Sequence, residues 1–184
     1  CRTYLDNLPE LVRREMGASD IVLASFFVPY RKAKIDFSYA DRLITGLIAA
    51  AQDTKARLII EAPPPQFERP AYACTKDWFR LNSQGCQFKL KKFEAERRPV
   101  MEWLAAHSTK SKGAMVVFDS APHLCKAGVC RAVDGTRPIF RDTNHLSKRG
   151  ATSLGPHFLR FVSKVSKQAR PAPGKDEINL GRKS

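Results

Sequence analysis

The chain has 184 residues, of which 43% are hydrophobic and 27% charged, and its formal net charge at pH 7 is +14. This length and composition fit one globular domain with a hydrophobic core. No apolar run approaches the roughly 18 residues that a membrane-spanning helix needs. The chain begins at Cys1 without a methionine, so we expect it to be part of a longer protein.

The positive charge is dispersed along the chain rather than gathered into one stripe. No zinc-finger spacing, glycine-rich phosphate loop or aromatic–basic RNA-binding signature accompanies it. A nucleic-acid-binding domain, which would bind DNA in a salt-sensitive way, is therefore the weakest of the alternatives. Such a surface suits a polyanionic glycan, an anionic membrane or simple solubility equally well.

Five cysteines indicate the compartment. Cys74 and Cys86 bracket one short polar loop, and Cys125 and Cys130 bracket another. No Cys-x-x-Cys pair occurs and the four histidines are not spaced as metal partners, so we expect no metal site. Two short-range pairs predict two disulfides in an oxidising compartment, with Cys1 left for a cysteine upstream. Five free thiols in a cytosolic protein are the alternative.

Apolar patterns predict the elements in chain order. Buried strands are expected at 21–28, 57–61 and 114–118, and helices at 6–16, 38–53, 88–108 and 147–167. Pro99 should begin or kink its helix, and Gly155-Pro156 should interrupt the last one. A long excursion at 63–87, a small hairpin within 131–140 turning at Asp134-Gly135, and a basic disordered tail at 169–184 complete the chain.

Strands that alternate with helices predict an α/β fold, in which a mostly parallel sheet lies between helices on both faces. Residues 1–168 would form this three-layer α/β/α sandwich. Ligands of such folds bind beyond the carboxyl ends of the strands. Loops that follow the predicted strands are therefore the place to look for a site.

Asp142 and His145 are the candidate catalytic residues. They lie three apart on the turn that enters the last helix, a spacing that can place the carboxylate against one imidazole nitrogen. The other nitrogen could then take a proton from a hydroxyl, as in the base half of a serine-type triad. The alternative is that Asp142 merely stabilises a helix N-terminus.

A resemblance supports the catalytic interpretation. The residues that carry it are the strand at 21–27 followed by Val28-Pro29-Tyr30, the strand Leu58–Ile60 running into Pro63-Pro64-Pro65, and the block Phe118-Asp119, Leu124-Cys125, Cys130 and Phe140-Arg-Asp142-Thr-Asn-His145-Leu-Ser-x-x-Gly150-Ala151. With these motifs the chain resembles an SGNH-type (GDSL-like) hydrolase domain. More narrowly, it resembles the periplasmic domain fused to the C-terminus of bacterial acyltransferase-3 membrane proteins, which O-acylate surface polysaccharides.

The resemblance implies roles for particular residues. His145 would be the catalytic base, Asp142 its orienting carboxylate, and Gly150 with Ala151 would allow close packing of the last helix. The family's nucleophile is the serine of a Gly-Asp-Ser block on the first strand, and this chain contains no such block. The domain would therefore lack its first strand, and its oxyanion-hole Gly and Asn are not evident either, since Ala24-Ser25-Phe26 stands at that place.

Other serines and histidines are weaker candidates. Ser120 is expected to be a polar residue at a strand end, Ser25 a core residue, and Ser147 a helix cap. His107 and His157 fall within predicted helices, where histidines are more often packed or solvent-facing than catalytic. His123, close to Cys125, is a candidate to line the site.

The resemblance thus implies an SGNH domain whose parent protein transfers an acyl group, most simply acetyl, to a cell-envelope glycan through a Ser-His-Asp mechanism. Its partners would be the glycan acceptor, an acyl donor and a fused membrane domain, with no cofactor, no metal and no nucleic acid. It would be periplasmic and tethered to the bacterial inner membrane. A stand-alone esterase and a non-catalytic glycan-binding domain of the same fold are the alternatives.

Overall fold

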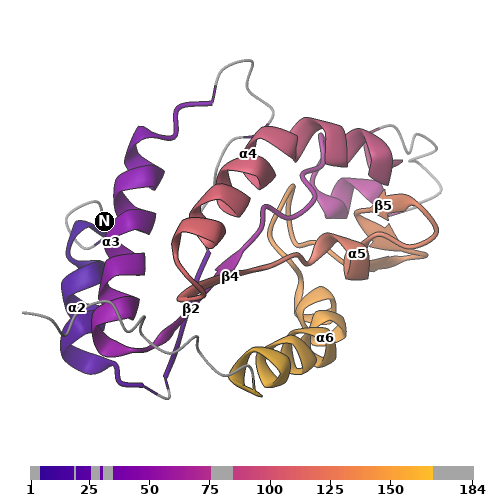
Figure 1. The fold of residues 1–184 in the computed structure, drawn as a ribbon. Helices are drawn as coiled ribbons and strands as arrows, with labels where there is room; N and C mark the ends of the chain where they lie inside the picture. Colours follow the sequence, from indigo (N-terminus) through magenta and orange to yellow (C-terminus); the bar gives the residue numbers. More distant parts are fainter. Residues whose placement is uncertain (1–4, 19, 26–29, 31–34, 76–84, 168–184) are drawn as a thin grey trace, which may run out of the picture.

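A three-stranded parallel sheet forms the centre of the protein, in the order β1–β2–β4 (Figure 1). The computed structural model describes residues 5–18, 20–25, 30, 35–75 and 85–167, and the statements below concern these residues. The strands are β1 (Ile21–Ala24), β2 (Arg57–Glu61) and β4 (Met115–Phe118). The predicted α/β class with a parallel sheet is confirmed.

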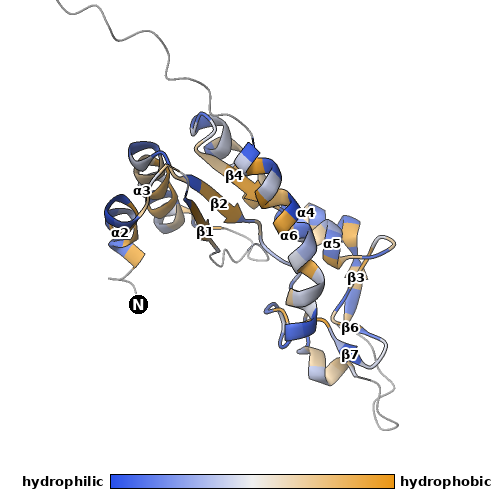
Figure 2. Ribbon diagram, turned by 90° about the horizontal axis from the view of Figure 1, so that it is seen from below, coloured by the Kyte–Doolittle hydropathy of each residue, from blue (hydrophilic) through white to orange (hydrophobic). Residues whose placement is uncertain are grey.

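Side chains of β2 alternate between two cores, because successive residues of a strand point to opposite faces. Leu58 and Ile60 pack into the larger core with the helices α3 (Ser38–Thr54) and α4 (Leu90–Lys110). Ile59, on the other face, packs against α6 (Lys148–Lys167). Helices therefore cover both faces, as in a three-layer sandwich, and the strands between them are apolar (Figure 2).

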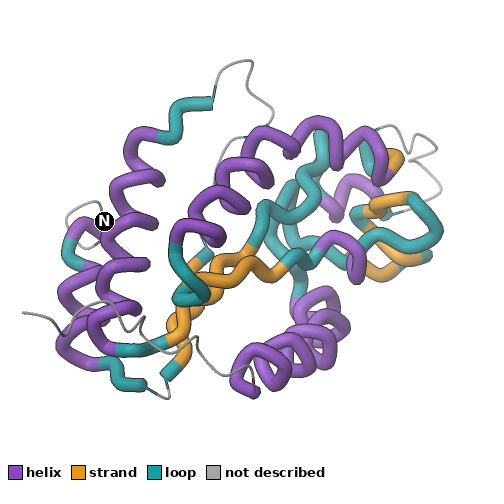
Figure 3. The backbone as a smooth tube through the Cα atoms, in the orientation of Figure 1, coloured by secondary structure: helices purple, strands orange, loops and turns teal. Residues whose placement is uncertain are grey.

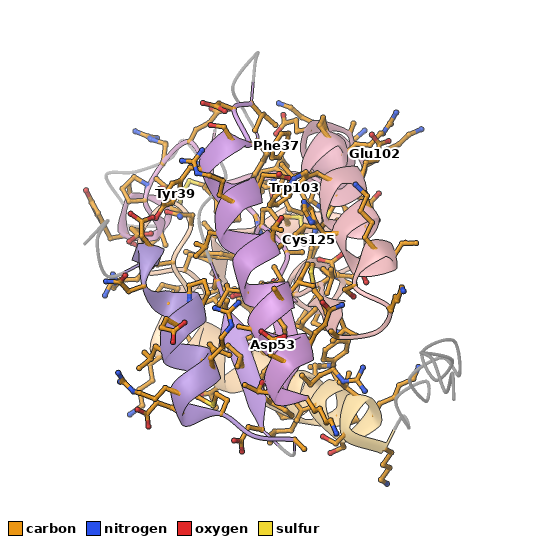
Figure 4. The ribbon with its side chains drawn as sticks, turned by 60° about the vertical axis from the view of Figure 1, so that its left-hand side comes forward. Phe37, Tyr39, Asp53, Glu102, Trp103 and Cys125 are labelled. Carbon is orange, nitrogen blue, oxygen red and sulfur yellow. A yellow bond between two sulfur atoms is a disulfide. The ribbon has the colours of Figure 1, made fainter. Side chains whose placement is uncertain are left out.

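An aromatic contact and a shared carboxylate join α3 to α4. The rings of Phe37 and Trp103 stack at 4.9 Å between the two helices (Figure 4). Asp41 accepts a hydrogen bond from Nε1 of Trp103 at 3.0 Å and lies 2.8 Å from Nε2 of His107. The helix α2 (Leu8–Glu15) packs on the outside of α3, where Arg13 binds Asp53 at 2.9 Å.

The last helix is not interrupted, so that prediction is wrong: Pro156 lies inside the continuous helix α6. Pro99 lies inside α4 and does not begin the helix. A proline leaves the carbonyl four residues earlier without its partner. Those carbonyls belong to Ala95 and Thr152, both on exposed residues, so water can replace the lost bond. Residues 87–89 also form a strand rather than the start of α4.

The chain beyond the sheet is held by two disulfides, as predicted: Cys74–Cys86 and Cys125–Cys130. These connections lead away from the carboxyl ends of the strands (Figure 3). The smaller elements there are η1 (Ala71–Cys74), β3 (Gln87–Lys89), α5 (Ala121–Leu124), β5 (Val129–Arg131), β6 (Val133–Asp134) and β7 (Arg137–Pro138). The pair β6–β7 is the predicted hairpin.

Three predictions concern residues outside the described part of the chain: Cys1, the end of the strand predicted at 21–28, and the tail predicted at 169–184.

None of the helices in the described part of the chain is both long enough and apolar enough to cross a bilayer.

A buried ion pair fixes the end of β4. Nη1 and Nη2 of Arg97 donate to the two carboxylate oxygens of Asp119, at 2.7 and 2.6 Å, and Arg97 is only 4% exposed. The guanidinium also lies 4.5 Å from the centre of the Phe93 ring. Asp119 in turn accepts the backbone N–H of Ala121 at 3.1 Å. The pair thus ties α4 to the start of α5.

Asp119→Ala should lower the free energy of unfolding by about 3 kcal/mol, because it leaves the Arg97 charge buried without a partner. Urea denaturation of the oxidised protein measures this loss. Glu15→Ala, which removes the partner of the exposed Arg14, should cost less than about 1 kcal/mol. Equal losses in the two variants would contradict a structural role for the buried pair.

Gly150 permits the first turn of α6 to approach the backbone before it. A Cβ atom on this glycine would collide with the carbonyl oxygen of Ile139. Ser147 caps the helix, since its Oγ accepts the N–H of Gly150 at 3.1 Å, and the predicted cap is confirmed. The helix start and the hairpin end are therefore in direct backbone contact.

Gly150→Ala should destabilise the protein by about 1–3 kcal/mol, because the rigid carbonyl must move. The sign is diagnostic, since Gly→Ala inside a helix ordinarily stabilises by up to about 1 kcal/mol. Gly155→Ala is the matched control in the same helix, where no atom lies within 4 Å of the added Cβ. The midpoint temperature of thermal unfolding should therefore fall in Gly150→Ala and rise in Gly155→Ala.

Candidate active site

A short closed loop carries Asp142 and His145. Its two ends, Phe140 and Leu146, form an isolated β-bridge. Within it the N–H of Arg141 donates to the carbonyl of His145 at 2.7 Å. Phe140 is 1% exposed and packs edge-on against Phe67 at 4.9 Å. The loop is thus anchored in the core at its base while its tip remains accessible.

The carboxylate of Asp142 binds the imidazole, as the spacing predicts. Its Oδ2 lies 2.8 Å from Nδ1 of His145. Its Oδ1 accepts the backbone N–H groups of Asn144 at 3.0 Å and of His145 at 2.8 Å. The two oxygens therefore hold both the backbone and the ring of His145.

Asp142 stays ionised at any physiological pH. Partial burial of its carboxyl acts to raise the pKa, but the backbone N–H groups of His145 and Asn144 and the imidazole outweigh this effect and lower the pKa to about 2. An ionised carboxylate at Nδ1 favours the tautomer that carries its proton there. Nε2 of the neutral ring is then the proton acceptor, and it makes no hydrogen bond to any described residue. The His145 side chain is 65% exposed.

The loop that carries Asp142 and His145 adjoins the carboxyl edge of the sheet. Leu146, next to His145, lines a cavity of about 230 Å³ together with Glu61 and Phe118, the last residues of β2 and β4. The backbone N–H of Phe67, in the segment after β2, donates to the carbonyl of Thr143 at 2.7 Å. Burial raises the pKa of Glu61, although a hydrogen bond from Ser25 opposes that shift.

Other predicted candidates fall elsewhere. Ser120 is fully buried, and its Oγ has no hydrogen-bond partner in the described part of the chain, so it is not presented to a substrate. Ser25 is exposed and bonds to Glu61, so the prediction that it lies in the core is wrong, because β1 ends at Ala24. The ring of His123 stacks on that of His157 at 4.0 Å and lines a different cavity.

A second Asp–His pair was not predicted. Asp41 and His107 are 66 residues apart, so no local spacing signals their contact. The His107 side chain is only 12% exposed, and its partner carboxylate also binds Trp103. This pair fastens two helices, whereas the imidazole of His145 is open to solvent. Among the described residues no group of three or more His, Cys, Asp or Glu side chains could hold a metal ion.

No curated protein matches the sequence of this chain. Among solved structures it is similar to the periplasmic domain of the lipopolysaccharide acetyltransferase of Salmonella ser. Paratyphi A, with a TM-score of 0.55 and 15% sequence identity. The match covers 86% of this chain but 61% of that structure, so the likeness shows the fold over part of a longer domain. Residues 1–160 match the family model described as "SGNH domain (fused to AT3 domains)", and the chain therefore belongs to this family of SGNH domains.

Proposed function

We propose that this chain is the SGNH domain of an acyltransferase that O-acylates, most simply O-acetylates, a cell-envelope polysaccharide. The observation that carries the proposal is the Asp142–His145 pair, with its orienting contact at 2.8 Å and its exposed second nitrogen. The structural neighbour, named as a lipopolysaccharide acetyltransferase, supports the same class of acceptor.

In this mechanism a serine outside the chain attacks the carbonyl carbon of an acyl donor, and Nε2 of His145 takes the serine proton. The tetrahedral intermediate expels the donor's leaving group, which receives that proton, and an acyl-enzyme remains. A sugar hydroxyl then gives its proton to Nε2 and attacks the acyl-enzyme, so that the serine is released and regains the proton. Asp142 stabilises the imidazolium formed in each half-reaction.

We assign the serine-bearing segment to the outer edge of β1. Strands of parallel sheets are normally covered on both faces, yet Leu23 of β1 is 53% exposed. Leu23 also lines the cavity of about 230 Å³ at the carboxyl edge. A further strand beside β1 would end near this cavity. Donors for the oxyanion are assigned to the same segment, because the amides of Asn144 and His145 are already bound to Asp142.

The proposed location is the periplasm, with the domain tethered to the inner membrane through a fused acyltransferase domain. Two disulfides support an oxidising compartment, and the family description supports the fusion. The membrane domain would supply the acyl donor, and the glycan acceptor would reach the domain from the periplasm.

Hydrolysis is the second candidate function. The imidazole of His145 is 65% exposed, so water can reach the position that the sugar hydroxyl would take. A domain that worked in this way would remove acyl groups from glycans. Assays that follow both acyl transfer to the glycan and release of free acid separate the two activities.

His145→Ala in the intact protein should lower acyl transfer by about 10³-fold or more, because the nucleophile and the acceptor both lose their base. Incorporation of labelled acyl groups into the glycan measures the effect, and circular dichroism checks the fold. The control is His107→Ala, which removes the other carboxylate-bound imidazole and should leave transfer within a few-fold of wild type. Transfer retained in His145→Ala would remove this residue from the mechanism.

Asp142→Asn tests whether the orienting carboxylate is ionised. Because folding lowers the pKa of Asp142 to about 2, the ionised carboxylate contributes stability that is fully present above its ordinary pKa of about 4 and is lost as the pH falls toward 2. The part of the unfolding free energy that wild type gains over Asp142→Asn from this carboxylate should therefore be present in full at pH 5 and shrink as the pH falls toward 2. A difference that stays unchanged as the pH falls from about 5 toward 2 would show that the contacts of Asp142 do not lower its pKa.

A further inference from the structure

A second and larger cavity, of about 640 Å³, opens beside the first turns of α6. Its walls come from α5 and the loop after it, from the small hairpin, and from α6. The side chains that give it its character are His123, Lys126, Asp134, Ile139, Lys148 and Arg149. Its volume is typical of ligand sites, which measure about 300–1,000 Å³.

This cavity has an excess of positive charge. Lys126 and Lys148 form no ion pair with any residue that the structure describes. Arg149 lies 3.5 Å from Asp134, the only carboxylate among the described residues of the lining. Two lysines of the lining therefore carry charges that no described carboxylate pairs with.

The start of α6 adds to this excess. Its first turn contains Lys148 and Arg149 and no acidic residue. Positive side chains are disfavoured at a helix N-terminus, where the helix dipole is itself positive. Residues that go against such a local preference, with no contact that compensates for it, are typical of functional sites. An anion in the cavity would relieve the repulsion among these groups.

The cavity adjoins the loop of the candidate active site. Ile139, in its wall, accepts the backbone N–H of Ser147 at 2.9 Å, and this bond closes the base of the segment that carries Asp142 and His145. Gly150, Thr152 and Ser153 line this cavity, whereas Ala151, Leu154 and Gly155 line the smaller one. The two cavities thus flank opposite sides of the first turns of α6.

We propose that the larger cavity binds an acidic sugar unit of the glycan acceptor, that is, a saccharide bearing a carboxylate or a phosphate. This inference rests on the proposed function, which makes a glycan the acceptor. Lys126 and Lys148 bind the anionic group as point charges, and Ile139 with the imidazole of His123, held by stacking on His157, borders the sugar ring. A unit bound here directs its neighbour in the glycan toward the loop of His145.

The test is to titrate saccharides into the full chain. Calorimetry measures the affinity, and changes in amide chemical shifts locate the binding site. The probes are trigalacturonic acid, glucose 6-phosphate, neutral maltotriose and inorganic phosphate. We expect binding of at least one acidic saccharide and none of maltotriose. Trigalacturonic acid identifies a carboxylate-bearing unit and glucose 6-phosphate a phosphorylated one.

The Lys126→Gln/Lys148→Gln variant should weaken binding of the acidic saccharide at least tenfold. Lys91→Gln/Lys164→Gln removes the same charge from exposed positions outside the cavity and should change affinity less than twofold. Equal weakening in both variants would indicate only non-specific attraction and overturn the proposal. Inorganic phosphate that binds as tightly as the saccharides would also overturn it, because no sugar would then be recognised.

Vesicles that contain phosphatidylglycerol test a membrane surface as the anionic partner. Vesicle binding that requires Lys126 and Lys148, without binding of either acidic saccharide, would overturn the proposal. His145→Ala should bind the saccharide as wild type does. Failure of this inference and failure of the proposed function are therefore distinguishable. The affinity for the acidic saccharide tests the binding site, and acyl transfer tests the catalytic role of His145.

Discussion

The carboxylate of Asp142 accepts two backbone N–H groups with one oxygen and meets an imidazole nitrogen with the other. These three contacts shape the loop, keep the carboxyl ionised and set the orientation of His145. They have this effect only because the loop cannot shift as a whole. Phe140 holds the base of the loop in the aromatic core beside Phe67, and the β-bridge between Phe140 and Leu146 closes it.

The features that the sequence predicts well are those whose partners are close along the chain. Asp142 and His145 are three residues apart and Cys125 and Cys130 five apart, so local geometry alone brings them within reach. The parallel sheet follows from the alternation of apolar strands with amphipathic helices. Its strand β2 (Arg57–Glu61) has the predicted bounds because its three central residues are buried on both faces.

The features that the sequence misses depend on contacts across the fold. Asp119 and Arg97 are 22 residues apart and Asp41 and His107 are 66 apart, and neither pair forms a motif. Pro156 was expected to break a helix because propensity ignores solvent exposure, which lets water satisfy the freed carbonyl. The lysines of the larger cavity could not be grouped from the sequence either, since Lys126 and Lys148 are far apart along the chain and line one cavity only in the folded protein.

The proposed mechanism places the base and the nucleophile on different segments, and this division has a physical consequence. Nε2 of His145 needs a serine hydroxyl within hydrogen-bond distance, about 2.6–3.2 Å. The exposed Leu23 on β1 means that such a segment would bury apolar surface as it positions the hydroxyl, so docking and assembly of the active site are coupled. Transfer over hydrolysis further requires that the acceptor exclude water from an imidazole that is 65% exposed. A saccharide anchored by its acidic unit beside α6 would do this, because it covers the loop while presenting its own hydroxyl.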